Sequence, residues 1–187
     1  MKKVIIVLGP TAVGKTKIGI ELAKRLNTEI ISGDSVQVYK GLDIGSAKVT
    51  HEEAQGIKHH LIDILDPTDT YSVCDFQKEA RRLIDELDVP IIVGGTGLYI
   101  KAAISNYEFD APKRDYSFEE EYKDYSNEAL YELLLQKDKK MTEIIHPNNR
   151  KRVLRALYAV SVDEPLSEKN KKDELLYDPS SIICKTL

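Results

Sequence analysis

A glycine-rich segment near the N-terminus has the residue types that bind phosphate. Residues 9–16 have the sequence Gly-Pro-Thr-Ala-Val-Gly-Lys-Thr and fit the P-loop pattern G-x-x-x-x-G-K-[ST] at every position. The glycines permit a tight backbone path whose N–H groups turn toward phosphate oxygens, Lys15 adds a positive charge, and Thr16 offers a hydroxyl to Mg²⁺. We therefore predict a site for a diphosphate or triphosphate, with Mg²⁺ as cofactor, formed by Gly9, Pro10, Thr11, Ala12, Val13, Gly14, Lys15 and Thr16.

The elements around this loop are those that a phosphate-binding loop needs. Residues 4–8 form an unbroken apolar run rich in β-branched side chains, as expected of a buried parallel strand. Apolar residues then recur with loosely helical spacing from Ile18 to Leu26, so the loop joins a strand to a helix. The N-terminus of that helix adds its dipole to the phosphate site.

A carboxylate follows the next predicted strand, at residues 29–32. Residues just beyond the carboxyl ends of parallel strands face the ligand crevice, so we expect Asp34 to lie near the P-loop. The alternative is an aspartate that only caps a turn or a helix.

Two other polar segments also allow two interpretations. Residues 40–48 hold two glycines and two lysines, which either lie near phosphate or only solubilise the surface. The adjacent His59 and His60 lie in a third predicted strand, at residues 58–65. Neighbouring residues of a strand point to opposite faces, so we expect structural histidines rather than ligands of one metal ion.

The chain continues with an amphipathic helix and a fourth buried strand. The helix has one apolar stripe and ends before Pro90, and the strand at residues 91–93 is followed by Gly94-Gly95-Thr96. A motor-type ATPase would place an acidic residue there to hold magnesium. Its absence argues against such an ATPase, although not against a nucleotide kinase.

After Ser105 the composition changes, because residues 107–125 hold six tyrosines or phenylalanines among many acidic residues. We predict an α/β fold, a P-loop parallel sheet flanked by helices with a small helical insertion. The core comprises residues 1–105, and the insertion over the active site comprises residues 106–145. Residues 146–187 return to the core with a basic helix and a final strand. The insertion is either a substrate lid or a surface helical hairpin.

The basic helix begins at Arg150-Lys151-Arg152, and Arg152 and Arg155 are neighbours on its surface at i, i+3. Its cations either contact a polyanion or form a solvated face.

Composition limits the classes of protein. The chain has 187 residues, 42% hydrophobic content and no apolar run of membrane-spanning length, so we expect no membrane partner. Cys74 and Cys184 are far apart, which favours free thiols and a cytoplasmic location. The net charge of −4 argues against indiscriminate polyanion binding but allows a local basic face. We expect a monomer.

Five motifs in order resemble the tRNA dimethylallyltransferases, also called isopentenyl-diphosphate:tRNA transferases. The motifs are the P-loop and residues 34–48, 59–63, 94–100 and 146–157. Many proteins share the P-loop, whereas the block that begins at Asp34 is far more specific.

This resemblance implies a reaction. The P-loop would hold the diphosphate of dimethylallyl diphosphate, and the acceptor would be N6 of adenosine 37, in the anticodon loop of tRNAs reading codons that start with U. An exocyclic amine is a poor nucleophile, so a carboxylate that takes its proton helps, and Asp34 is the candidate base. The resemblance also places catalytic Thr11 near the bridging oxygen and implies tRNA contacts from Asp34, Ser35, Val36, Gln37, Thr96, Lys151, Arg152 and Arg155.

The sequence departs from the family in two respects. The arginine that relatives carry after the Gly-Gly-Thr block has no clear counterpart, Arg114 being a candidate. Relatives also continue well beyond the position of Leu187, so we expect a piece of a longer enzyme. Three alternatives stay open: an adenylate isopentenyltransferase that acts on a free nucleotide, a small-molecule kinase whose P-loop binds ATP, and a non-catalytic remnant. The insertion and basic helix favour tRNA, and the Asp34 block favours prenyl transfer.

Overall fold

The computed structural model describes residues 1–107, 116–162, 166 and 174–183, with the backbone alone at 181–183. It contains two compact units. Unit 1 comprises Met1–Glu108 and Asp173–Leu187, and unit 2 comprises Phe109–Lys172. Each unit is described by itself below.

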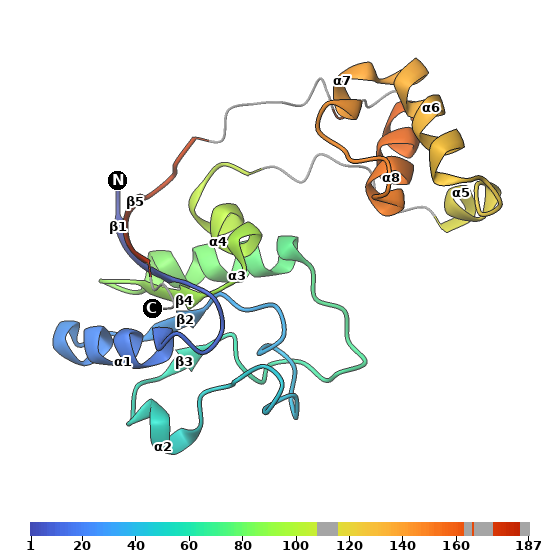
Figure 1. Cartoon of the computed structure of the whole chain (residues 1–187). Coiled ribbons are helices and arrows are strands. Elements are labelled where there is room, and N and C mark those ends of the chain that lie inside the picture. The colour runs from blue at the N-terminus through green and yellow to red at the C-terminus, as the bar shows by residue number, and fades with distance from the viewer. Residues whose placement is uncertain (108–115, 163–165, 167–173, 184–187) are drawn as a thin grey trace. The chain divides into compact units, whose positions relative to one another are not determined.

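Unit 1 is built on a five-stranded parallel sheet in the order β3-β2-β4-β1-β5 (Figure 1). Because β4 lies between β1 and β2, the carboxyl ends of these three strands meet at one edge of the sheet. Leu8 lies opposite Gly94, and Ser32 lies opposite Val93. The strands are β1 (Lys3–Leu8), β2 (Ile30–Ser32), β3 (His59–His60), β4 (Ile91–Gly94) and β5 (Asp178–Ile183).

Helices cover both faces of this sheet, as the sequence predicted (Figure 1). Helix α1 (Lys15–Leu26) packs Ile20 and Ala23 on one face, in a buried cluster with Val7, Ile30 and Ile91. Helices α3 (Val73–Glu86) and α4 (Gly97–Ile104) cover the other face and bury a cluster centred on Phe76, which stacks on Tyr99 at 4.7 Å. A short helix, α2 (His51–Ala54), precedes β3.

The last strand begins earlier than its apolar residues indicate. Its consecutive apolar residues begin at Ile182, yet Asp178 and Pro179 already belong to β5, where Pro179 lies opposite Val4. Proline is tolerated because β5 is at the edge of the sheet, where an unpaired side of the strand needs no donor. The predicted strand at 58–65 is also shorter, since regular pairing is limited to His59–His60, with an isolated bridge from Leu65 to Tyr39.

Unit 2 is helical. Its elements are α5 (Tyr116–Glu121), α6 (Asn127–Lys137), α7 (Lys139–Thr142) and α8 (Arg150–Ser161). They bury one apolar cluster to which α6 contributes Leu130 and Leu134 and α8 contributes Val153 and Leu157.

The position of the basic helix differs from the predicted division of the chain. We grouped residues 146–187 with the core, whereas α8 belongs to unit 2 and only the end of this segment returns to the sheet. The apolar face of α8 finds its partner in α6 of the insertion, and the sequence pattern of a helix does not specify that partner.

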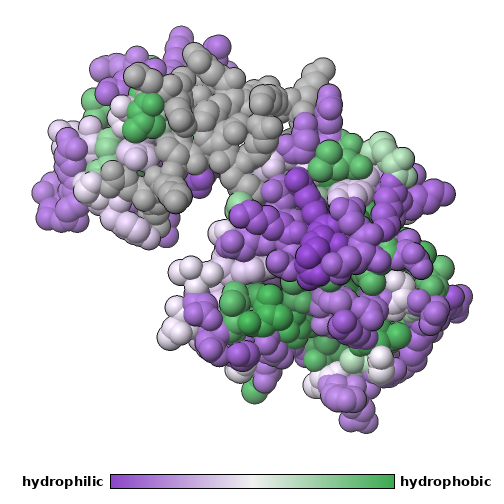
Figure 2. Space-filling model, turned by 180° about the vertical axis from the view of Figure 1, so that it is seen from behind, coloured by the Kyte–Doolittle hydropathy of each residue, from purple (hydrophilic) through white to green (hydrophobic). Residues whose placement is uncertain are grey.

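Hydrophilic side chains dominate the face in Figure 2, where hydrophobic ones form separate patches. Across the described ranges, no helix combines the length and the apolar character that crossing a membrane requires.

Candidate functional site

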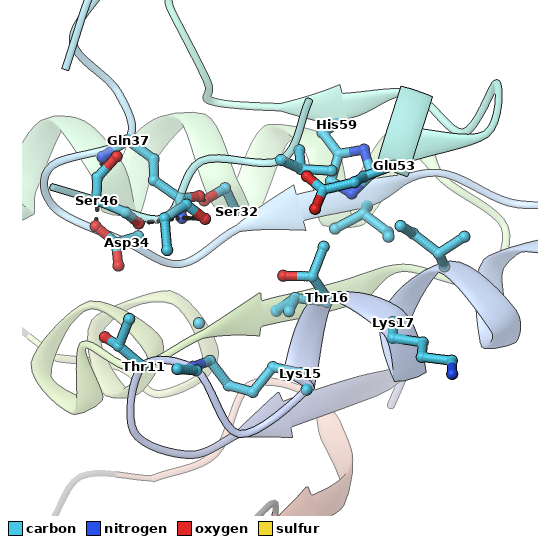
Figure 3. Close-up of a pocket in the computed structure, with 18 of the residues that line it drawn as sticks. Thr11, Lys15, Thr16, Lys17, Ser32, Asp34, Gln37, Ser46, Glu53 and His59 are labelled. Atoms are coloured by element: carbon cyan, nitrogen blue, oxygen red, sulfur yellow. Dashed lines mark hydrogen bonds between the residues drawn. The ribbon is translucent and has the colours of Figure 1, made fainter. Parts of the chain in front are cut away.

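A cavity of about 480 Å³ lies at the carboxyl edge of the sheet in unit 1 (Figure 3). The P-loop and α1 form one wall, and the segments that follow β2 form the other. Its polar lining includes Thr11, Lys15, Thr16, Ser32, Asp34, Gln37, Ser46, Glu53 and His59. The predicted phosphate loop and the predicted base therefore share one cavity.

The P-loop has the backbone that its glycines predict. Gly14 is the N-cap of α1 and has φ 84°, a left-handed conformation that glycine adopts without a Cβ penalty. Close approach also requires glycine after β4, because a Cβ on Gly94 would overlap the backbone of Gly33 and one on Gly95 would lie 3.1 Å from the Gly9 carbonyl oxygen. These glycines let the ends of β1, β2 and β4 converge on the cavity.

Lys15 and Thr16 provide the charge and the hydroxyl of the phosphate site. Lys15 extends along the loop (Figure 3), and its Nζ donates a hydrogen bond to the Pro10 carbonyl oxygen at 2.5 Å. The described residues offer no hydrogen-bond partner to the Thr16 hydroxyl, which faces the cavity (Figure 3). A hydroxyl that shares a cavity with the Asp34 carboxylate suits Mg²⁺, which usually binds few protein groups together with phosphate oxygens and water. The donor set therefore fits magnesium held jointly by the protein and a diphosphate.

Asp34 lies on the wall opposite Thr11 and also fixes a turn (Figure 3). Its Oδ1 accepts hydrogen bonds from the amides of Val36, at 2.8 Å, and Gln37, at 3.3 Å. Within the described chain, Oδ2 has no such partner. The two interpretations of Asp34 from sequence are thus compatible, because one oxygen holds the turn and the other remains available in the cavity.

Gln37 lines the cavity, but its amide is fully engaged with the protein. Oε1 accepts from the Ser32 hydroxyl at 3.0 Å, and Nε2 donates to the carbonyl oxygens of Ser46, at 3.0 Å, and Ala47, at 3.4 Å. The side chain therefore braces the loop beside Asp34.

The far end of the cavity is formed by Glu53 and His59 (Figure 3). Glu53 closes a capping box with Thr50, whose backbone and side-chain hydrogen bonds lower the pKa of the Glu53 carboxyl. Burial lowers the pKa of His59 below its usual 6.5, against the opposing effect of the Ile57 carbonyl 2.9 Å from Nδ1. Since that carbonyl accepts the Nδ1 proton, Nε2 of the neutral ring is a bare acceptor, and it is buried without a described partner.

The loop lysines do not line the cavity. Lys48 is buried, and its ammonium contacts Asp43 and Asp63 rather than the phosphate loop. Lys40 is exposed and pairs with Asp66 at 3.2 Å. Lys48 therefore does not belong to the lining of the cavity, and its burial excludes a purely solubilising role.

Several predicted residues lie outside the cavity lining. They are Gly9, Pro10, Val13, Ser35, Val36 and Thr96. Thr96 is the N-cap residue of α4, and Val36 is 42% exposed.

The predicted basic residues all belong to unit 2. Lys151, Arg152 and Arg155 are exposed on α8, and no carboxylate of the described residues pairs with them. Arg150 differs, because its guanidinium donates to the backbone carbonyls of Tyr122, Lys123 and Tyr125 and so holds the turn that follows α5. Arg114 lies outside the described residues.

The sequence did not identify Ser46, Val49, Glu53 or His59 as lining residues. Ser46 lies within the family block that begins at Asp34, which was a usable signal. His59 likewise begins the motif at residues 59–63. Val49 and Glu53 reach the cavity through the path of the chain after residue 48, and no local pattern reveals that path.

Comparisons with known proteins agree on one family. A family model described as IPP transferase matches residues 37–186. A tRNA dimethylallyltransferase of Anoxybacillus flavithermus is 50% identical over 189 residues, covering 97% of this chain and 60% of the relative. The chain thus spans about three fifths of the length of this curated relative.

The solved structures that resemble this chain belong to proteins with the same activity in their names. The crystal structure of a tRNA delta(2)-isopentenylpyrophosphate transferase from Staphylococcus epidermidis has a TM-score of 0.62 and 44% identity, covering 98% of this chain and 63% of that one. A eukaryotic dimethylallyltransferase acting on tRNA has a TM-score of 0.83 and 28% identity, covering all of this chain and 49% of that one.

Proposed function

Because this chain belongs to the IPP transferase family, we propose that it transfers a dimethylallyl group from dimethylallyl diphosphate to N6 of adenosine 37 in tRNAs that read codons starting with U. The observation that carries the proposal is the common cavity of the P-loop and Asp34. A phosphate-binding loop faces a carboxylate across a space large enough for a small diphosphate and a base.

In the proposed reaction, N6 attacks C1 of the allyl group while the bond between C1 and the diphosphate oxygen breaks. The electron pair of that bond leaves with the diphosphate, and the proton of N6 goes to Oδ2 of Asp34. Oδ1 stays bound to the amides of Val36 and Gln37, which keeps the carboxylate oriented as the base.

The P-loop stabilises the charge that develops on the leaving group. Its N–H groups, the Lys15 ammonium and the N-terminus of α1 all favour negative charge at this position. Thr16 would hold Mg²⁺, which supplies further positive charge to the diphosphate when bound. Thr11 contacts the bridging oxygen in this proposal.

The acceptor base must leave its stack to reach a cavity of this kind, and a base in an anticodon loop is easier to extrude than one in a duplex. We assign contacts around the extruded adenine to Ser35, Val36 and Gln37. Thr96 and the exposed cations Lys151, Arg152 and Arg155 contact the tRNA.

An acceptor competition tests this function. The intact protein is incubated with labelled dimethylallyl diphosphate and Mg²⁺, and either tRNA or AMP is supplied as the acceptor. We expect label in tRNA. Label in AMP would instead identify an adenylate isopentenyltransferase, and transfer of a γ-phosphate from ATP to a small acceptor would identify a kinase.

A further inference from the structure

Lys48 is a buried cation outside the cavity. Only 4% of its side chain is exposed. Its Nζ donates to the Tyr39 carbonyl oxygen at 2.8 Å, to Asp43 Oδ1 at 2.7 Å and to Asp63 Oδ1 at 2.6 Å. An ammonium has three donors, and each of them has a partner here. We call Lys48, Asp43 and Asp63 the Lys48 cluster.

The charge of this lysine is maintained despite its burial. Burial by itself lowers the pKa of Lys48, but the hydrogen bonds to Asp43 and Asp63 outweigh it, so the pKa is raised overall. Separating a buried charge from its partners lowers the stability of the fold strongly, whereas an exposed ion pair contributes little to that stability. The Lys48 cluster is therefore a fixed connection. It differs from the exposed ion pair that Lys40, on the same loop, forms with Asp66.

Three chain segments meet at this connection. The Tyr39 carbonyl belongs to the turn after Asp34, Asp43 to the loop that follows, and Asp63 to the loop after β3. Backbone hydrogen bonds join the same segments. The Asp63 amide donates to the Gln37 carbonyl oxygen at 3.1 Å, and the Lys40 amide donates to the Leu65 carbonyl oxygen at 2.8 Å.

The loop after β3 needs such support. Leu61 and Asp63 have φ angles of 61° and 54°, which are uncommon and costly for residues with a side chain. Strained residues of this kind persist only where surrounding contacts hold them, and Asp63 is held through both its carboxylate and its amide.

The connected segments end at the cavity. The loop that contains Asp43 also contains the Ser46 and Ala47 carbonyls, which hold the Gln37 amide. The backbone of Gln37 in turn donates to Asp34 Oδ1. Lys48 does not line the cavity, yet three contacts join it to the carboxylate of Asp34: from Lys48 to Asp43, from the Ser46 and Ala47 carbonyls to Gln37, and from Gln37 to Asp34.

We propose that Lys48 is a positioning residue, which fixes the orientation of the Asp34 carboxylate through Gln37 and thereby the place where the acceptor amine loses its proton. This inference rests on the proposed function. It assigns the lysine a role on the acceptor side of the cavity and none in holding the diphosphate.

The variant Lys48→Met tests the proposal, with Lys40→Met as the matched control. Misplacing a catalytic group by about 1 Å costs on the order of 10²-fold in rate, so kcat of Lys48→Met should fall by about that factor. KM for dimethylallyl diphosphate should change by less than about twofold, because the P-loop is untouched. Lys40→Met should retain both constants, since its ion pair is exposed.

A native kcat in folded Lys48→Met would overturn the proposal. A loss of kcat together with diphosphate affinity, in proportion to the fraction of unfolded protein, would also overturn the proposal, because such a loss indicates a general structural role for Lys48. If Lys48→Met does not fold, Asp43→Asn replaces it, since Asp43 is 65% exposed and its loss leaves Lys48 paired with Asp63. The same split between kcat and KM is then expected, and its absence overturns the proposal.

Amide hydrogen exchange separates this inference from the proposed function. The amides of Val36 and Gln37, which bind Asp34, should exchange faster in Lys48→Met and at the native rate in Lys40→Met. If these two amides exchange faster in Lys48→Met but the native protein transfers no prenyl group, the proposed function is refuted and the connection from Lys48 to Asp34 is retained. Native exchange rates at both amides would refute the connection itself.

Discussion

Replacing Asp34 by asparagine separates its two roles in the structure. Oδ1 holds a turn through the amides of Val36 and Gln37, and Oδ2 is the proposed base. An asparagine retains the Oδ1 acceptor at the same place but cannot take a proton. We therefore expect Asp34→Asn to keep the fold and the diphosphate site while losing catalysis.

The expected magnitudes differ strongly between the two roles. Losing a positioned base costs about 10²–10⁴ in rate, which is about 2.7–5.4 kcal/mol of activation free energy. The free energy of unfolding should change by less than about 1 kcal/mol, because both hydrogen bonds to Oδ1 remain. Asp34→Ala removes these bonds as well and should lose about 1–2 kcal/mol of stability.

The assay is single-turnover transfer to tRNA with saturating dimethylallyl diphosphate, alongside urea unfolding of each variant. Near-native turnover of Asp34→Asn would refute the assignment of the base and leave Asp34 as a turn residue only. Equal stability losses in the asparagine and alanine variants would refute the division of roles between the two oxygens.

Three further predictions concern other parts of the chain. Lys15→Ala should weaken binding of dimethylallyl diphosphate, measured by calorimetry, because the loop loses its only lysine; unchanged affinity would contradict the phosphate site. The double variant Arg152→Ala, Arg155→Ala should flatten the plot of log binding constant for tRNA against log salt concentration. Each lost phosphate contact removes about 0.9 units of slope on a duplex, or about 0.7 on a single strand. An unaltered slope would mean that the two arginines form a solvated face. Burial lowers the pKa of His59 below 6.5 in the folded protein, so the unfolded chain binds a proton at this histidine more readily. The free energy of unfolding should therefore fall as the pH drops from about 7 through the lowered pKa. Urea unfolding of His59→Gln should lack that slope and the exposed His51→Gln should keep it, and an identical pH profile in all three proteins would contradict the assignment.

The parts of the site that depend on local sequence were predictable. The P-loop follows β1 and Asp34 follows β2, and parallel strands bring such positions to one edge of the sheet. The glycines after β4 were recognised as a motif, although their role in letting Gly33 and Gly94 approach closely needed the structure.

Long-range contacts were not predictable in the same way. A lysine in a polar loop is usually exposed, and Lys48 is buried only because Asp43 and Asp63, 5 and 15 residues away, converge on it. The sequence of α8 likewise could not identify α6 as its packing partner, since an apolar stripe predicts that a helix face is buried but not which element covers it.

The central claim is tested most directly by locating the modified nucleoside. Unmodified tRNA that reads codons starting with U is incubated with the intact protein, dimethylallyl diphosphate and Mg²⁺, then digested and sequenced by mass spectrometry. We predict one dimethylallyl group on N6 of adenosine 37, absent when the Asp34→Asn variant is used. A prenyl group at another nucleotide, or none in tRNA while free AMP is modified, would contradict the account.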